Sequence, residues 1–212
     1  MEKISERIDL KEIEKKVWLT TFEDGVFDIY FGLLFLGMTI SRIFDEILPN
    51  LSSIIGLSII GSSILFFLLV KRYISQPRIG KVVFGRSRII RKTKMLVVLL
   101  INFSIWLILW ILNTINPEIK LFAPGFFSSL LFGMLFIATP LFFVAYFLQY
   151  KRLYLIAGLI GISFSLEELF YLVNIPEPFD GIIAFGLIST IILSMGLLIF
   201  IKFLKKYPLP TK

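Results

Sequence analysis

The sequence predicts an all-α polytopic membrane protein, a bundle of six transmembrane helices. Three observations lead to this fold class. The chain of 212 residues is 57% hydrophobic and 17% charged, whereas soluble domains are about 45–50% apolar and about 25% charged. The apolar residues form six blocks, each near the ~20 residues that cross a bilayer as a helix. Finally, the Lys and Arg residues are concentrated in the segments between blocks on one side.

The six blocks follow one another with short connections that carry turn signals such as Pro49-Asn50 and Asn116-Pro117. A segment at 1–25 precedes them, and because no apolar run starts before Val26 we do not expect a signal peptide. A basic loop at 71–94 separates the second block from the third, and a tail follows at 205–212. The predicted spans are 26–48, 51–70, 95–115, 125–149, 153–175 and 182–204.

The basic loop orients the chain. Segment 71–94 contains nine Lys or Arg residues and no Asp or Glu. Loops rich in Lys and Arg stay on the cytoplasmic side of a membrane. Placing this loop inside also places every basic residue of the chain inside except Arg42 and Lys120. We therefore expect a multi-pass protein of the cell membrane with both termini in the cytoplasm.

The chain contains no Cys and no His. Disulfides, thiolate chemistry, the commonest general base and the commonest metal ligand are thereby excluded. No Ser–His, HExxH or cysteine arrangement can be built, so we predict no catalytic residues, no metal site and no cofactor. The composition therefore makes an enzyme the less expected class of protein.

Charged residues inside two predicted spans are the first candidate site. Arg42 lies ~24 Å along the first span and Glu167 ~21 Å along the fifth, so both have similar depth. An unpaired charge there is costly, which predicts a salt bridge from Arg42 to Glu167 or Glu168. The second carboxylate could then face a cavity and carry a proton or bind a cation. Alternatively, Arg42 reaches outward toward Asp45 and Glu46, with a structural role only.

A second candidate is a polar path formed by the third and fourth spans. Asn102 and Asn113 lie along one side of the third span, and Thr139-Pro140 should bend the fourth. Asn residues in membrane helices also join neighbouring helices by hydrogen bonds, so packing is the competing interpretation. Small residues at four-residue spacing predict close helix contacts, namely Ser129 with Gly133, Ala157 with Gly161, and Gly186 with Thr190 and Ser194.

The N-terminal segment predicts an amphipathic helix. Asp9 and Glu12 fit a capping box, and Leu10, Ile13 and Val17 form one apolar face. With Trp18 beside that face, the helix is expected to lie in the inner membrane interface, or else to pack against the basic loop.

An acidic corner follows at Glu23, Asp24 and Asp28. Asp24 and Asp28 are one helical turn apart and could present two carboxylates to a cation or to a Mg²⁺-bound diphosphate. Ion pairing of this corner with the basic loop is the simpler interpretation.

Within the basic loop, two short β-prone runs at 80–84 and 88–91 flank Gly85, Arg86 and Ser87, which predicts a small β-hairpin. Its charges predict binding of anionic lipid headgroups or of a partner, either another protein or a second copy of the chain. Nucleic acid is not expected. The binding residues would be Arg78, Lys81, Arg86, Arg88, Arg91 and Lys92.

Two segments, EDGVFD at 23–28 and QPRIGKVVF at 76–84, resemble those of uncharacterised prokaryotic multi-span membrane proteins. Those proteins pair an acidic EDG stretch before the first span with a Pro-Arg-x-Gly motif after the second. The likeness covers about fifteen residues. It implies the same topology and implies no particular activity.

Two classes of function remain. In the first, the bundle moves a small solute, ion or proton, with Glu167 or Glu168 as carrier, Arg42 as counter-ion and the bend at Pro140 as gate. In the second, it transports nothing and is an anchor or accessory subunit that binds anionic lipid or a protein through its basic loop.

Overall fold

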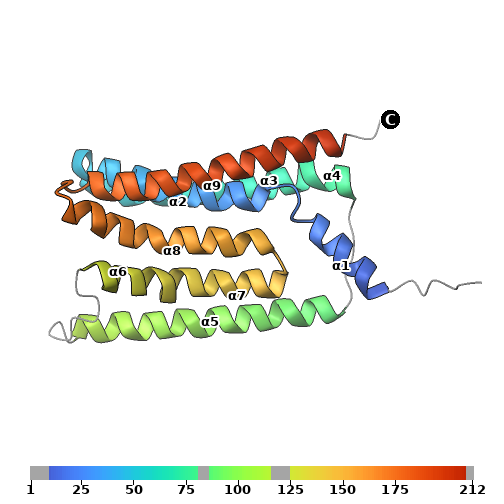
Figure 1. The fold of residues 1–212 in the computed structure, drawn as a ribbon, viewed down its shortest axis with the longest axis horizontal. Helices are drawn as coiled ribbons and strands as arrows, with labels where there is room; N and C mark the ends of the chain where they lie inside the picture. Colours follow the sequence, from blue (N-terminus) through green and yellow to red (C-terminus); the bar gives the residue numbers. More distant parts are fainter. Residues whose placement is uncertain (1–9, 81–85, 116–124, 209–212) are drawn as a thin grey trace, which may run out of the picture.

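The computed structural model describes residues 10–80, 86–115 and 125–208, and all regular secondary structure in these ranges is helical (Figure 1). Two elements, η1 and η2, are π-helical segments that continue an α-helix. The elements are α1 (Leu10–Thr20), α2 (Val26–Ile47), α3 (Pro49–Val70), η1 (Lys71–Ser75), α4 (Gln76–Ile79), α5 (Arg86–Ile115), α6 (Phe126–Phe132), η2 (Gly133–Ala138), α7 (Thr139–Leu148), α8 (Lys151–Leu172) and α9 (Phe179–Lys206).

Within residues 10–80, 86–115 and 125–208, six helices are long and apolar enough to cross a membrane, which confirms the predicted multi-pass class. The second is longer than predicted, because η1 and α4 extend α3 as far as Ile79, and the third begins about one turn early, at Ile90. The apolar stretches are Val26–Asp45, Leu51–Ile79, Ile90–Ile115, Phe126–Leu148, Lys151–Leu172 and Phe179–Lys206.

The helices pack in the order α3, α2, α9, α8, α7, α5, with α6 and η2 beside α8 (Figure 1). Buried residues concentrate where α2, α8 and α9 meet, around Phe35, Ile160 and Ile188. None of the described residues in the most apolar part of α5, within Ile90–Ile115, is buried. Exposed apolar faces of this kind suit lipid chains, which are as apolar as leucine.

Glycine permits the closest helix contacts. A Cβ on Gly133 would lie 2.1 Å from the carbonyl oxygen of Gly161, so η2 and α8 touch backbone to backbone. This confirms the predicted close contact for both residues. The predicted irregularity at Thr139-Pro140 takes the form of a π-helix that ends at Ala138, where the Thr139 hydroxyl donates to the Met134 carbonyl at 2.8 Å.

The predicted β-hairpin is wrong. Its second run and part of its turn form the first helical turns of α5, and no strand occurs in the ranges described. Residues 81–85, which include most of the first run and Lys81, lie outside those ranges. An isolated two-stranded hairpin is marginally stable. Residues 88–91 instead lead directly into a long apolar helix, so continuing that helix satisfies their backbone groups.

The predicted amphipathic interfacial helix at the N-terminus is also not supported. A helix is present at α1, but Ile13 of the expected apolar face is 47% exposed, whereas Trp18 is 5% exposed and packs against the bundle. Asp9 of the predicted capping box lies outside the described residues. Burial of Trp18, and not the stripe of Ile13 and Val17, fixes the position of α1.

Candidate functional site

Two of the three carboxylates of the acidic corner are fully buried. Asp24 and Asp28 have no exposed surface, and Gly25 between them adopts φ +69°. A Cβ on Gly25 would lie 2.7 Å from the carbonyl oxygen of Gly196 on α9, so only glycine allows this close approach. The turn before α2 thereby places two acids inside the protein, where each needs a partner.

Asp24 pairs with Lys71, the first residue of η1. The Lys71 ammonium is 2.7 Å from Asp24 Oδ2 and donates to the Thr21 carbonyl at 2.5 Å. The predicted pairing between the acidic corner and the basic loop is therefore confirmed for Asp24. Glu23, by contrast, pairs with Lys206 of α9 at 3.0 Å.

Asp28 pairs with residues from the junction of α7 and α8. Arg152 Nη1 is 3.0 Å from Asp28 Oδ2, and the Tyr150 hydroxyl donates to Asp28 Oδ1. Burial raises the pKa of Tyr150, and the Asp28 carboxylate raises that pKa further. The phenol therefore stays protonated and remains a donor at neutral pH. We call Asp24, Asp28, Lys71, Tyr150 and Arg152 the buried ion network.

This arrangement favours ion pairing over the alternative of a divalent cation. Both acids contact cationic side chains of the protein, and no group of three or more His, Cys, Asp or Glu that could hold a metal ion occurs in the described part of the chain.

A second set of contacts joins α1 to α5 and to the end of α7. Trp18 Nε1 donates to the Leu148 carbonyl at 2.7 Å, and the Arg88 guanidinium lies 5.1 Å from the centre of the Trp18 ring. Arg88 also contacts Glu14 and Gln149, each at 3.2 Å. Arg88 is only 8% exposed, so this predicted lipid-binding residue is used inside the protein.

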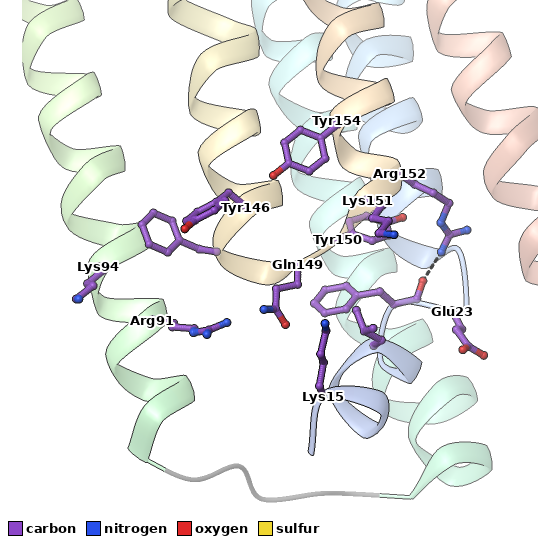
Figure 2. Close-up of a pocket in the computed structure, with 13 residues that line it drawn as sticks. Lys15, Glu23, Arg91, Lys94, Tyr146, Gln149, Tyr150, Lys151, Arg152 and Tyr154 are labelled. Carbon is purple, nitrogen blue, oxygen red and sulfur yellow. Dashed lines mark hydrogen bonds between the residues drawn. The ribbon is translucent and has the colours of Figure 1, made fainter. Parts of the chain in front are cut away.

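A cavity of about 670 Å³ opens beside these two sets of contacts. Among the described side chains, five cations from three helices line it, against the single acid Glu23. Figure 2 shows Lys15 of α1 and Arg91 of α5 pointing toward Gln149, with Lys151 and Arg152 at the start of α8. We call this space the basic cavity, and the end of the bundle that carries it the basic end. Its lining comprises Lys15, Leu19, Phe22, Glu23, Arg91, Lys94, Tyr146, Phe147, Gln149, Tyr150, Lys151, Arg152 and Tyr154.

Two of the other cavities are largely apolar. A crevice of about 720 Å³ lies between η1 and α5, with Asp24 and Lys71 on its wall and Met95 and Leu99 facing them. A shallower space of about 420 Å³ lies between α2 and α3, around Leu33 and Ile59.

At the opposite end, the salt bridge predicted for Arg42 is confirmed. Arg42 Nη2 is 2.7 Å from Glu167 Oε1, and Asp45, one of its two alternative partners, is exposed. Glu168 is half-buried. These residues line none of the four cavities that we describe. Their role as carriers stays a prediction.

The remaining predicted site residues are scattered. Asn102 and Asn113 are half-buried on α5 and, like Pro140, line none of the four cavities, whereas Thr139 lines an apolar groove. Arg78 donates to the Ile74 carbonyl at 2.9 Å. Lys92 lies 5.4 Å from the Trp18 ring, and among the described side chains of the predicted lipid-binding set only Arg91 lines the basic cavity.

Sequence reasoning missed Lys15, Tyr150, Lys151 and Arg152, which it used only to orient the chain. The YKRLY run at 150–154, two cations between tyrosines at a junction of spans, was the available signal. Comparisons with protein-family models, curated proteins and solved structures find no match to this chain. The candidate site therefore rests on its geometry.

Proposed function

We propose that this protein is a non-transporting membrane protein that binds a phosphate-bearing anion in the basic cavity, at the cytoplasmic face of the cell membrane. The observation that carries the proposal is the concentration of five cations and three tyrosines around a single cavity that contains one acid. The cytoplasmic assignment rests on the positive-inside rule, because the basic end carries most of the Lys and Arg residues.

The chemistry of the lining suits phosphate. Arginine presents a planar fork of donors to phosphate oxygens, and lysine adds a mobile point charge. Four of the five cations take part in none of the salt bridges found among the described residues, namely Lys15, Arg91, Lys94 and Lys151, whereas Arg152 already contacts Asp28. These four are therefore the expected anion ligands, and Arg152 contributes charge from the wall of the cavity.

The test is calorimetric titration of the purified protein in detergent with glycerol 3-phosphate at low salt. We expect Lys15→Gln combined with Arg91→Gln to weaken binding about tenfold or more. The matched control is Lys202→Gln combined with Lys205→Gln, which removes the same charge from α9 outside the cavity. Equal weakening of binding by both double variants would mean that only the overall charge matters, which would contradict the proposal. Absence of binding to the parent protein would also contradict it.

Transport of a proton or cation is the second candidate, favoured by the Glu167 carboxylate inside a predicted span. Flux into proteoliposomes tests it. A flux in the parent protein that Glu167→Gln or Glu168→Gln abolishes, and that Asp45→Asn leaves unchanged, would establish transport and remove the non-transporting part of the proposal.

A further inference from the structure

We infer that the ligand of the basic cavity is a membrane lipid with a phosphomonoester headgroup, whose acyl chain lies in an apolar groove along α7. This inference rests on the proposed function, because it names the class of molecule that supplies the phosphate.

An apolar groove adjoins the basic cavity. A groove of about 380 Å³ is lined by Thr139, Phe142, Phe143, Tyr146, Phe147 and Tyr154. Three of these residues, Tyr146, Phe147 and Tyr154, also line the basic cavity. The two spaces therefore adjoin at these three side chains, one of which, Tyr146, is 67% exposed.

The groove follows the length of α7. Five of its six residues lie on α7, from Thr139 to Phe147, a rise of ~12 Å along the helix axis. This helix belongs to the membrane-length stretch Phe126–Leu148. The groove thus runs from the basic end into the depth at which lipid chains lie, and it is open to them because Phe143 is 41% and Tyr146 67% exposed.

The order of polar and apolar residues from the cavity to the groove matches that of a phospholipid. Cations surround the cavity, tyrosines form the boundary that it shares with the groove, and phenylalanines line the groove beyond. Tyrosine is the residue type that favours the headgroup level of a bilayer. A phospholipid has the same order along its length, whereas a soluble phosphate would leave the aromatic groove unused.

The charge of the basic cavity favours one class of headgroup. The cavity sets five cations against one carboxylate, and a phosphomonoester carries ~1.5–2 negative charges at neutral pH. A phosphodiester headgroup such as that of phosphatidylglycerol carries fewer. The excess of positive charge therefore favours phosphatidic acid over phosphatidylglycerol.

The experiment compares three probes on the parent protein: dioleoyl phosphatidic acid, dioleoyl phosphatidylglycerol and glycerol 3-phosphate. We expect dioleoyl phosphatidic acid to bind at least about tenfold more tightly than glycerol 3-phosphate, because it alone of these two can bury methylene groups. We also expect it to bind more tightly than phosphatidylglycerol. Equal binding of phosphatidic acid and glycerol 3-phosphate would overturn the lipid inference and leave the proposed anion site intact. Equal binding of the two lipids would overturn the phosphomonoester.

Two variants of the groove locate the chain. Thr139→Phe fills the groove and should lower the affinity for dioleoyl phosphatidic acid about tenfold, with little change for glycerol 3-phosphate. The control, Thr139→Val, loses the same hydroxyl but keeps the space, so it should bind as the parent does. Unchanged lipid binding in Thr139→Phe would contradict the groove assignment. If this variant fails to fold, phosphatidic acid with a photoreactive acyl chain should label Phe142 or Phe143 of the parent, and labelling only outside α7 would overturn it.

Discussion

At the basic end, two carboxylates without exposed surface each contact a cation from another element, whereas at the opposite end Arg42 and Glu167 form one pair whose side chains are 42% and 20% exposed. Buried charges depend on their partners, because removing one leaves the other desolvated. Exposed pairs contribute little. The basic end is therefore expected to be the rigid part that positions the cavity, and the opposite end the part that tolerates change.

The largest effect should come from Asp28→Ala, which leaves the buried Tyr150 hydroxyl without its acceptor and the Arg152 guanidinium without its carboxylate. We expect the free energy of unfolding to fall by about 3–5 kcal/mol, measured by denaturation in detergent. The control is Asp45→Ala on the same helix, where the side chain is exposed. A similar loss for both substitutions would contradict the contrast between the two ends.

Lys71→Met should have the next largest effect, about 2–3 kcal/mol, because it leaves the Asp24 carboxylate buried and unpaired. The cost is below that of Asp28→Ala because Lys71→Met takes one ion-pair partner from Asp24, whereas Asp28→Ala takes the shared acceptor from two residues, Tyr150 and Arg152. The double variant Asp24→Asn with Lys71→Met removes both charges, so we expect it to be more stable than Lys71→Met alone. If the double variant is less stable than Lys71→Met, the loss in Lys71→Met comes from missing packing of the Lys71 side chain against Phe27 and not from the unpaired Asp24 carboxylate.

The sequence predicted the parts of this molecule that depend on local composition. Span length and the depth of Arg42 and Glu167 follow from counting residues along helices, so six membrane-length helices and that salt bridge were both within reach. Partners outside the spans, such as Tyr150 at the junction of α7 and α8, were not. Tyr150 and Asp28 are 122 residues apart, and no spacing rule connects them.

The wrong prediction of a hairpin and the unsupported prediction of an interfacial helix have a shared cause. Residues 88–91 have β-prone side chains, and Ile13 with Val17 suggests an apolar face, but both patterns are only four or five residues long. Burial of Trp18 against the end of α7, with Arg88 stacked on it, decides the position of both segments. Tertiary contacts of this size outweigh short-range propensity.

Trp18→Phe should have a smaller effect than either change in the ion network. It keeps an aromatic ring but removes the Nε1 donor to the Leu148 carbonyl, at a cost of about 1 kcal/mol. Because this bond joins α1 to α7, we expect faster tryptic cleavage at Lys15 and Lys16 in the variant than in the parent. Phe103→Leu, on the exposed face of α5, serves as control. Unchanged cleavage at both lysines would mean that other contacts hold α1 in place.

The smallest effect should be the coupling between Arg42 and Glu167. A double-mutant cycle with Arg42→Gln and Glu167→Gln should give about 1 kcal/mol or less in detergent, as for other partly exposed pairs. The same cycle in a bilayer sharpens the comparison, because a pair that lies within the hydrocarbon region loses water as an alternative partner. A coupling that rises in the bilayer would place this pair below the headgroups and give the two ends similar constraints. A coupling that stays small would leave the opposite end as the loosely paired one, with the constraint on this fold concentrated around Asp28 and the cavity beside it.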